Sequence, residues 1–244
     1  MHSAGTSGID SGCGPGSGSS RPRVVSWAWL GRAPYAEVLG LQERLRDGLI
    51  RGDDCETLLL VEHPKVITLG RNANPANVLA SPQTLEQADI PVLRVSRGGD
   101  VTFHGPGQLI GYPVFRLPSG VRAHVVAMGM AIVAVLAELG ISALWRDSHP
   151  GVWLGGEKIC AVGVHVRRGV AIHGFALNVT VDLHGYSAIV PCGLREFGVT
   201  SIAKVLGSAP SMDEMAARTA RAFERAFGIE LRSRSRLQIA NGNL

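Results

Sequence analysis

The chain has 244 residues, 45% of them hydrophobic and 18% charged, which is typical of a soluble globular protein with one large domain or two small ones. Its formal net charge of +4 is modest. The sequence contains no basic stretch interleaved with aromatic residues, so it does not predict nucleic-acid binding. The longest apolar run, residues 125–137, is too short to span a bilayer and predicts a buried core helix, so we expect no membrane partner.

Residues 1–22 are rich in Gly and Ser and lack the apolar run of a secretory signal, so we expect a flexible leader. The four cysteines, at positions 13, 55, 160 and 192, are irregularly spaced and form no CxxC pair. In a chain of this size that spacing argues against a disulfide framework and for a reducing compartment. We therefore expect a cytoplasmic protein.

Segments with helical or extended patterning follow one another from residue 35 onwards. A helix is predicted over residues 35–52, with Gly52 as its stop, and an apolar helix over residues 122–139. A last helix begins at Ser211, where Glu214 three residues later completes a capping box, and ends at Gly228. The predicted extended segments are residues 57–64, 66–71, 91–100, 101–117 and 151–183, the last with a hairpin turn at 167–169.

These strands and helices are mixed in order but show no regular βαβ alternation. That order predicts an α+β or irregular α/β protein with a mixed sheet flanked by helices, and we favour a single-domain α+β fold. We expect the domain to cover residues 23–232, between the leader at 1–22 and a tail at 233–244.

A glycine-rich stretch, "RGGDVTFHGPGQLIGYP", occupies residues 97–113. Glycine at this density lets backbone N–H groups approach a ligand closely, and it also suits a run of tight turns between strands. The stretch is neither a P-loop nor a dinucleotide fingerprint, because the spacing of its glycines and the residues after them differ from both. Either interpretation stays open from the residues alone.

Lys158 stands at the entrance of a strand within "GGEKICAVGVHV", residues 155–166. A lysine in that position either faces solvent, which is the more common case, or points into a cleft. Cys160 follows two residues later, so in a regular strand it shares a face with Lys158. If Lys158 lines a site, we expect Cys160 to line it too.

Cys192 lies between Pro191 and Gly193, outside any helical pattern. An open turn of this kind suits a reactive thiol that has a cation or base nearby, and His104 is one candidate partner. The histidines show no HxH, HxxxH or HExxH spacing, so we expect no metal site. The sequence lacks the GxSxG motif that would indicate a serine hydrolase.

Several segments together resemble one family: "EHP", "TLGR", "RGGDVTFHGPGQLIGYP", "GVWL", "EKICAVGVHV", "HGFALN" and "IVPCG", in this order over residues 30–228. They are similar to the octanoyltransferases of lipoate biosynthesis, the lipoate-protein ligase B family. The resemblance implies a biotin and lipoate ligase-like fold that needs no cofactor, neither ATP nor a metal. It implies transfer of an octanoyl group from octanoyl-acyl carrier protein to a lysine of the lipoyl domains of 2-oxoacid dehydrogenase complexes and of the glycine cleavage H protein.

The resemblance also implies roles for individual residues. Cys192 matches the family's acyl-carrying cysteine and Lys158 its partner lysine. The family usually has alanine where this chain has Cys160, which places a second thiol near the expected site. The implied substrate-binding residues are Arg97, Gly98, Gly99, Asp100, Val101, Thr102, Phe103, His104, Ala161, Val162, Gly163, Gly174, Phe175 and Ala176.

Three other functions are compatible with the residues. An ATP-dependent lipoate or biotin ligase on the same fold would need no cysteine. A scaffold that binds acyl carrier protein would form no covalent adduct. A cysteine–histidine amidase would hydrolyse its thioester instead of passing the acyl group to lysine.

Overall fold

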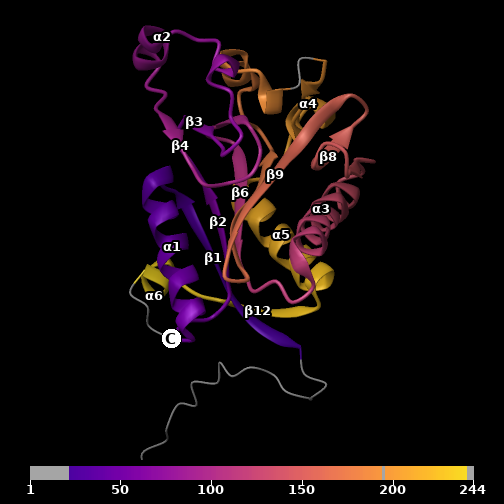
Figure 1. The fold of residues 1–244 in the computed structure, drawn as a ribbon. Coiled ribbons are helices and arrows are strands. Elements are labelled where there is room, and N and C mark those ends of the chain that lie inside the picture. Colours follow the sequence, from indigo (N-terminus) through magenta and orange to yellow (C-terminus); the bar gives the residue numbers. More distant parts are fainter. Residues whose placement is uncertain (1–21, 194–195, 241–244) are drawn as a thin grey trace, which may run out of the picture.

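The computed structural model of the chain describes residues 22–193 and 196–240, and its strands form two sheets (Figure 1). The larger, nine-stranded sheet has the order β12-β1-β2-β6-β10-β9-β8-β7, with β11 paired to β9, and the smaller has the order β4-β3-β5. β1 runs parallel to β2 and β12, whereas β6, β10, β9 and β8 pair antiparallel, so the large sheet is mixed. The strands are β1 (Arg23–Arg32), β2 (Thr57–Glu62), β3 (Val66–Leu69), β4 (Val92–Arg94), β5 (Val101–His104), β6 (Gln108–Val114), β7 (Leu144–Arg146), β8 (Gly151–Leu154), β9 (Glu157–Arg167), β10 (Val170–Asn178), β11 (Gly198–Val199) and β12 (Ile229–Ser233).

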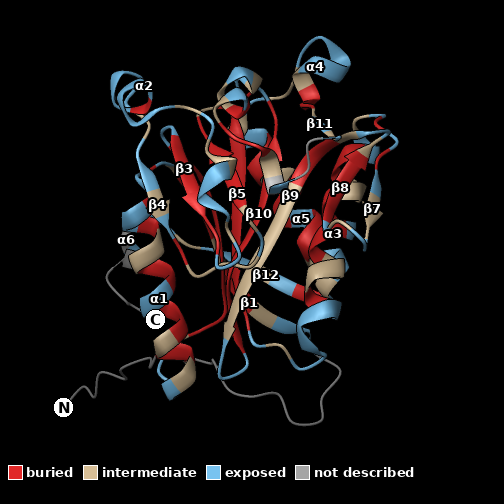
Figure 2. Cartoon of the chain, turned by 45° about the horizontal axis from the view of Figure 1, so that its top comes forward, coloured by how far each residue is buried: buried red, intermediate tan, exposed pale blue. Residues whose placement is uncertain are grey.

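Helices cover both faces of the large sheet. α1 lies on one face, and α3 and α5 lie together on the other (Figure 1). Successive residues of β2 alternate between the two cores: Leu58 and Leu60 pack with α3 and α5, and Leu59 and Val61 pack with α1. The central strands are therefore buried along their length (Figure 2). The helices are α1 (Tyr35–Arg51), α2 (Pro82–Gln87), α3 (Gly120–Glu138), α4 (Ile202–Leu206), α5 (Met212–Phe227) and α6 (Arg236–Ala240), with short 3-10 turns η1 (Pro75–Asn77), η2 (Leu183–Ala188) and η3 (Pro191–Gly193).

The ends of α1 and α5 follow from local chemistry, as the sequence predicts. α1 ends at Gly52, which adopts a left-handed conformation with φ of 92°. The hydroxyl of Ser211 accepts the backbone N–H of Glu214 at 3.2 Å and starts α5, and Gly228 ends it with φ of 60°. The mixed sheet with flanking helices confirms the predicted fold class.

α3 is longer than the apolar run that predicts it. With 19 residues and a mean hydropathy of 1.9, it is long and apolar enough to cross a membrane by length and composition. Its contacts are those of a core helix: Met128, Ile132 and Val135 are fully buried between the sheet and α5. The prediction of a core helix in this region is confirmed.

The small sheet carries a separate apolar cluster and positions the loop after β4. Ile67 of β3 and Val101 and Phe103 of β5 pack there with Tyr186 of η2. β3 pairs antiparallel with β5, so the Arg97–Asp100 loop is held beside the end of β3. The small sheet therefore positions the glycine-rich stretch over the large sheet.

Two features near the chain ends differ from expectation. Residues 236–240, in the expected tail, form α6, and Ile239 packs into the α1 core. Cys55 is disulfide-bonded, so the expectation that the cysteines form no disulfide is wrong at this residue. The hairpin turn predicted at 167–169 is present between β9 and β10, with Arg168 and Gly169 both at positive φ.

Candidate active site

A cavity lies where the Arg97–His104 segment crosses the large sheet. Its walls are this segment, the middle of β9 and the middle of β10. Glycine is required at Gly174, because a Cβ there would lie 2.1 Å from the carbonyl oxygen of Gly111, and Gly163 is also tightly placed, because a Cβ there would lie 3.0 Å from the carbonyl oxygen of Gly98. The close approach of loop and strands therefore depends on the missing side chains.

The structure brings the predicted substrate-binding residues together, with one exception. Phe103 points away from the cavity into the small-sheet core, where its ring lies 5.6 Å from that of Tyr186. Strand alternation explains this, because its neighbours Thr102 and His104 face the cavity. The predicted residues that line the cavity are Arg97, Gly98, Gly99, Asp100, Val101, Thr102, His104, Ala161, Val162, Gly163, Gly174, Phe175 and Ala176.

Arg97 holds the cavity's roof in place. Its Nη2 donates to the backbone oxygen and the hydroxyl of Thr68, at 2.7 and 2.8 Å, and its Nη1 donates to the oxygen of Gly98 at 3.1 Å. These bonds tie the loop to β3. A half-buried arginine with several hydrogen bonds fixes geometry better than a mobile one, so Arg97 shapes the cavity wall.

One end of the cavity is closed by polar aromatic residues that sequence reasoning missed. Tyr35, the first residue of α1, stacks on His104 with ring centroids 5.7 Å apart, and its hydroxyl lies 3.4 Å from Nδ1 of His173. The hydroxyl of Tyr112 on β6 is hydrogen-bonded to Nε2 of His63 at 2.8 Å. These residues lie far apart in sequence, and the only signal was the excess of His and Tyr beside the glycines.

The histidines at this end are neutral. Burial lowers the pKa of His104 to about 3 and that of His173 to about 3, with nearby Arg97 acting in the same direction. His104 Nδ1 lies 2.8 Å from Oε1 of Gln108, whose amide in turn donates to Asn178 at 2.8 Å. His104 is thus a member of a buried hydrogen-bond network and a weak base, which argues against the Cys192–His104 pairing considered from the sequence.

Lys158 does not itself line the cavity; it lies on β9, three residues before Ala161, which does. It is 8% exposed, and its Nζ lies 4.7 Å from the centre of the Trp153 ring. The solvent-facing alternative for Lys158 is therefore wrong. Gly151 makes room for its stem, because a Cβ there would lie 3.3 Å from Lys158 Cε.

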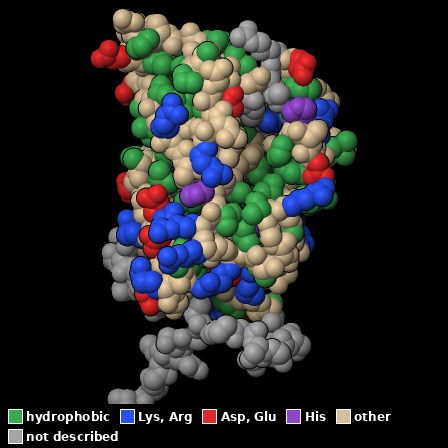
Figure 3. Space-filling view, in the orientation of Figure 1, with side chains coloured by type: hydrophobic (Ala, Val, Ile, Leu, Met, Phe, Trp, Pro, Cys, Tyr) green, Lys and Arg blue, Asp and Glu red, His purple; other side chains and the backbone are tan. Residues whose placement is uncertain are grey.

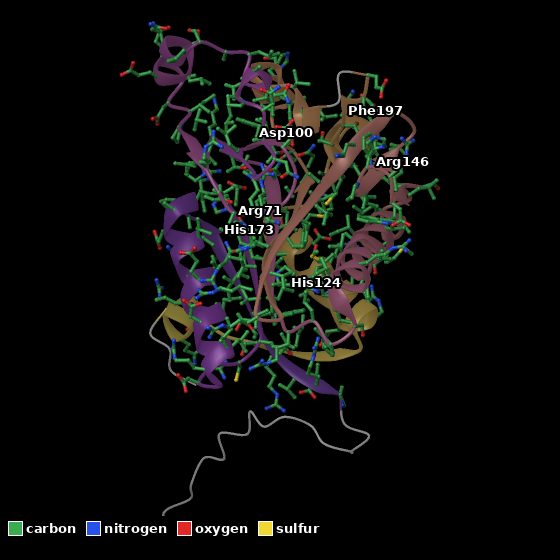
Figure 4. The ribbon with its side chains drawn as sticks, in the orientation of Figure 1. Arg71, Asp100, His124, Arg146, His173 and Phe197 are labelled. Atoms are coloured by element: carbon green, nitrogen blue, oxygen red, sulfur yellow. The ribbon has the colours of Figure 1, made fainter. Side chains whose placement is uncertain are left out.

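Cys192 lies in η3. The side chain of Cys192 is outside the described residues, and the neighbouring residue Gly193 shows where the turn lies. A Cβ on Gly193 would lie 2.7 Å from Oδ2 of Asp100, a cavity residue that also accepts the amide of Asn77 at 2.5 Å. η3 therefore sits at the Asp100 end of the cavity. Asp100 and His173 mark the two ends in Figure 4.

Cys160 is not part of the cavity, contrary to the expectation that it shares a face with Lys158. The register between β8 and β9 shifts by one residue, so Trp153 pairs with Lys158 but Val152 pairs with Cys160. The extra residue, Ile159, reverses the alternation, and Cys160 packs in the α3–α5 core. Cys160 is fully buried, and burial raises the pKa of its thiol to about 12. It is therefore a protonated core thiol.

Among the described residues, no group of three or more His, Cys, Asp or Glu side chains is arranged to hold a metal ion. The cavity has an apolar and glycine-lined middle and a wall of neutral histidines and tyrosines at one end, and Lys158 lies on β9 three residues before the lining residue Ala161. This arrangement suits an elongated apolar group with a reactive head.

The family comparison agrees with the geometry. Residues 34–224 match the family described as lipoyl protein ligase A/B catalytic domain. The octanoyltransferase of Solibacter usitatus (strain Ellin6076) is 48% identical over 205 residues, covering 83% of this chain and 92% of the relative. That of Chloroflexus aurantiacus (strain ATCC 29366 / DSM 635 / J-10-fl) is 41% identical over 216 residues, covering 86% and 97%.

Solved structures of lower identity share the fold. Lipoate-protein ligase A bound with ATP superposes with a TM-score of 0.71 at 20% identity, covering 88% of this chain and 91% of that one. A lipoate protein ligase of T. acidophilum with bound lipoic acid gives 0.69 at 18% identity, covering 88% and 91%. The chain therefore belongs to the lipoyl protein ligase A/B catalytic-domain family and, within it, to the octanoyltransferases, which are acyl-transferring enzymes.

Proposed function

We propose that the chain moves an octanoyl group from acyl carrier protein to a lysine of a lipoyl domain, through a thioester on Cys192. The observation that carries the proposal is a cavity suited to an acyl chain, with η3 beside its lining residue Asp100 and Lys158 three residues before its lining residue Ala161. Val199, which follows Cys192 by seven positions in the sequence, pairs with Lys158 through β11 and β9. This pairing places a segment close in sequence to Cys192 beside Lys158.

The cavity's length fits the proposed acyl group. The stretch of β9 from Ala161 to Val164, which pairs with His173, measures roughly 10 Å at the usual rise of a strand. An extended eight-carbon chain measures roughly 9 Å from ordinary bond lengths and angles. Burying the chain contributes about 0.8 kcal/mol per methylene, so the hydrocarbon itself holds the substrate in place.

In the first step, the Cys192 thiolate attacks the carbonyl carbon of the octanoyl thioester. The bond from that carbon to the carrier's sulfur breaks, and the carrier leaves as a thiol after taking up a proton. A free cysteine is only a few per cent thiolate at neutral pH, and the Lys158 ammonium stabilises the charged form. One thioester replaces another, so the step is nearly balanced in energy.

In the second step, the amine of the acceptor lysine attacks the carbonyl carbon of the Cys192 thioester. The carbon–sulfur bond breaks, an amide forms, and the Cys192 sulfur leaves as a thiolate. The amine must lose a proton, and Lys158, once neutral, accepts it. His104 is too weak a base for this role, because the pKa of its buried imidazole is about 3.

The surface charge suits acidic partners. Lys and Arg side chains gather over α1 in the lower left of Figure 3, with Asp and Glu side chains among them. Acyl carrier proteins and lipoyl domains, as acidic proteins, would be attracted to such a face, which raises association rates. We expect kcat/KM with octanoyl-acyl carrier protein to fall as salt rises from low to physiological concentration. If kcat/KM does not change with salt, acyl carrier protein is not attracted to this face by its charge.

Transfer without nucleotide tests the reaction type. Purified chain, octanoyl-acyl carrier protein and a lipoyl domain should yield octanoylated lipoyl domain in the absence of ATP. An ATP-dependent ligase would instead use free octanoate with ATP and would keep this activity in Cys192→Ala. That result would contradict the proposal, and carrier binding with no turnover would contradict it in favour of a scaffold.

A further inference from the structure

The ring of Trp153 contacts the Lys158 ammonium, which the proposed chemistry uses. Trp153 is 2% exposed and lies on β8 directly opposite Lys158. Its Nε1 donates to the backbone oxygen of His149 at 3.0 Å, which fixes the orientation of the indole. Lys158 Nζ lies 4.7 Å from the ring centre, within the range of a cation–π interaction.

The register shift described above creates this contact. Because Ile159 is the extra residue, Lys158 is brought opposite Trp153 while Cys160 turns into the core. The shift thus turns the Cys160 thiol into the core, where burial raises its pKa although the nearby Lys158 charge acts in the opposite direction. It also keeps the ammonium out of the apolar cluster, where burying a charge is costly.

The same indole contacts the residue that precedes β11. The ring of Phe197 lies 5.1 Å from that of Trp153 at an interplanar angle of 69°, an edge-to-face arrangement. Immediately after Phe197, Gly198 and Val199 form β11 and pair with Glu157 and Lys158. The indole therefore contacts both the lysine and the start of the strand that pairs with it.

Arg146 encloses this cluster from the side of β7. Its guanidinium carbon lies 4.8 Å from the Trp153 ring centre and 5.9 Å from that of Phe197. Figure 4 shows Arg146 and Phe197 beside each other near the upper ends of β8 and β9. With Arg146 and Phe197 over it, the Trp153 ring is kept from water, and a cation–π contact is stronger when water is excluded.

We propose that Trp153 is a positioning residue: its indole face holds the Lys158 ammonium in a fixed position, while its edge-to-face contact with Phe197 supports β11 where that strand pairs with Lys158. The proposal rests on the proposed function, in which Lys158 assists Cys192. A tryptophan serves both contacts at once because its ring is large, flat and rigid.

Fluorinated tryptophan at position 153 tests the electrostatic part without changing shape. Fluorine withdraws electron density from the ring face and weakens its attraction for a cation. We expect the rate of acyl-enzyme formation to fall stepwise with fluorination, to about one tenth, with KM for octanoyl-acyl carrier protein unchanged. A purely structural role predicts no change along the series, and that result would overturn the proposal.

Ordinary substitutions supply a second, independent test. Trp153→Phe keeps an aromatic face and should retain most of the rate, whereas Trp153→Leu should lose about tenfold. The matched control is Trp145→Leu on neighbouring β7, whose indole donates to Asp147 and should leave kcat unchanged. Equal losses in the phenylalanine and leucine variants would count against the ring face.

A double-mutant cycle separates this proposal from the proposed function. In a Lys158→Met background, Trp153→Leu should cause little further loss, because the interaction it removes is already gone. Additive losses would contradict the positioning role while leaving Lys158 in its role. If Lys158→Met alone forms acyl-enzyme at the normal rate, the proposed function of Lys158 fails instead.

Discussion

The two ends of the acyl cavity are built from opposite kinds of chemistry. The end that we propose as reactive has η3 beside Asp100, with Lys158 on the Trp153 ring three residues before the cavity-lining Ala161. At the closed end, Tyr35, His104 and His173 form a buried wall whose histidines have pKa values near 3. These histidines are polar but neutral, whereas the proposed chemistry uses the Lys158 ammonium.

The difference between a neutral histidine wall and a charged lysine indicates which polar residues take part in the proposed reaction. A buried imidazole that donates to a glutamine amide is a fixed, uncharged partner, so the closed end is suited to defining a shape. Lys158, whose ammonium contacts the Trp153 ring, is suited to stabilising a thiolate. Predictions follow from changing each end separately.

The largest effect is expected at the reactive end. Lys158→Met removes the ammonium while keeping the length of the side chain, and kcat for octanoyl transfer should fall by roughly a thousandfold, within the usual range for a proton-transfer group. The control is Lys204→Met, which removes an exposed lysine that pairs with Glu157 at 2.6 Å on the same strand. Loss of activity in both variants to the same degree would contradict a special role for Lys158.

A smaller effect is expected in the middle of the cavity. Ala176→Leu places three more carbon atoms in the acyl path, opposite Ala161. Each excluded methylene costs about 0.8 kcal/mol, so kcat/KM with the octanoyl donor should fall on the order of 100-fold. A hexanoyl donor should lose much less, and Ala137→Leu, at an exposed site on α3, serves as the control. Equal losses for both donors would show that the cavity does not hold the chain.

The smallest effect is expected at the closed end and concerns stability. The pKa of His63 is lowered by burial from 6.5 to about 4, so below pH 6.5 the unfolded chain binds a proton that the folded chain excludes. The free energy of unfolding should therefore fall as pH decreases from 6.5 towards 4, by on the order of 2 kcal/mol at pH 5 for this histidine.

Denaturant unfolding at pH 7 and pH 5 measures this dependence. His63→Gln should lose part of the difference between the two pH values, because the titrating group is gone. His184→Gln, at an exposed site, should keep the full difference. If His63→Gln has the same pH dependence as the parent chain, the histidine is not held neutral by the fold.

Local patterns predicted much of the fold, and pairing between distant segments explains what they missed. The stops of α1 and α5 and the hairpin at Arg168 follow from glycines and caps within a few residues. The shift at Ile159 depends on which residue of β8 lies opposite, so no local pattern placed Cys160 in the core. The parallel pairing of β1 with β12 joins the two ends of the domain and has no local signal.

In the site, too, some residues have a local sequence signal and others are positioned only by the tertiary structure. The resemblance identified segments that line the cavity, but a run of consecutive residues in one strand cannot all face one way, and Phe103 points elsewhere. Tyr35 and Trp153 were missed because each reaches the site from a different element. The period-2 alternation of β5 would have excluded Phe103, whereas Tyr35 required the tertiary structure.

The central claim is that Cys192, and not Cys160, carries the acyl group. Intact mass spectrometry after mixing the chain with octanoyl-acyl carrier protein, without acceptor, measures this directly. The account predicts one added octanoyl mass that is present in the parent chain and in Cys160→Ala and absent in Cys192→Ser. An octanoyl adduct that persists in Cys192→Ser, or that disappears in a folded Cys160→Ala variant, would contradict it.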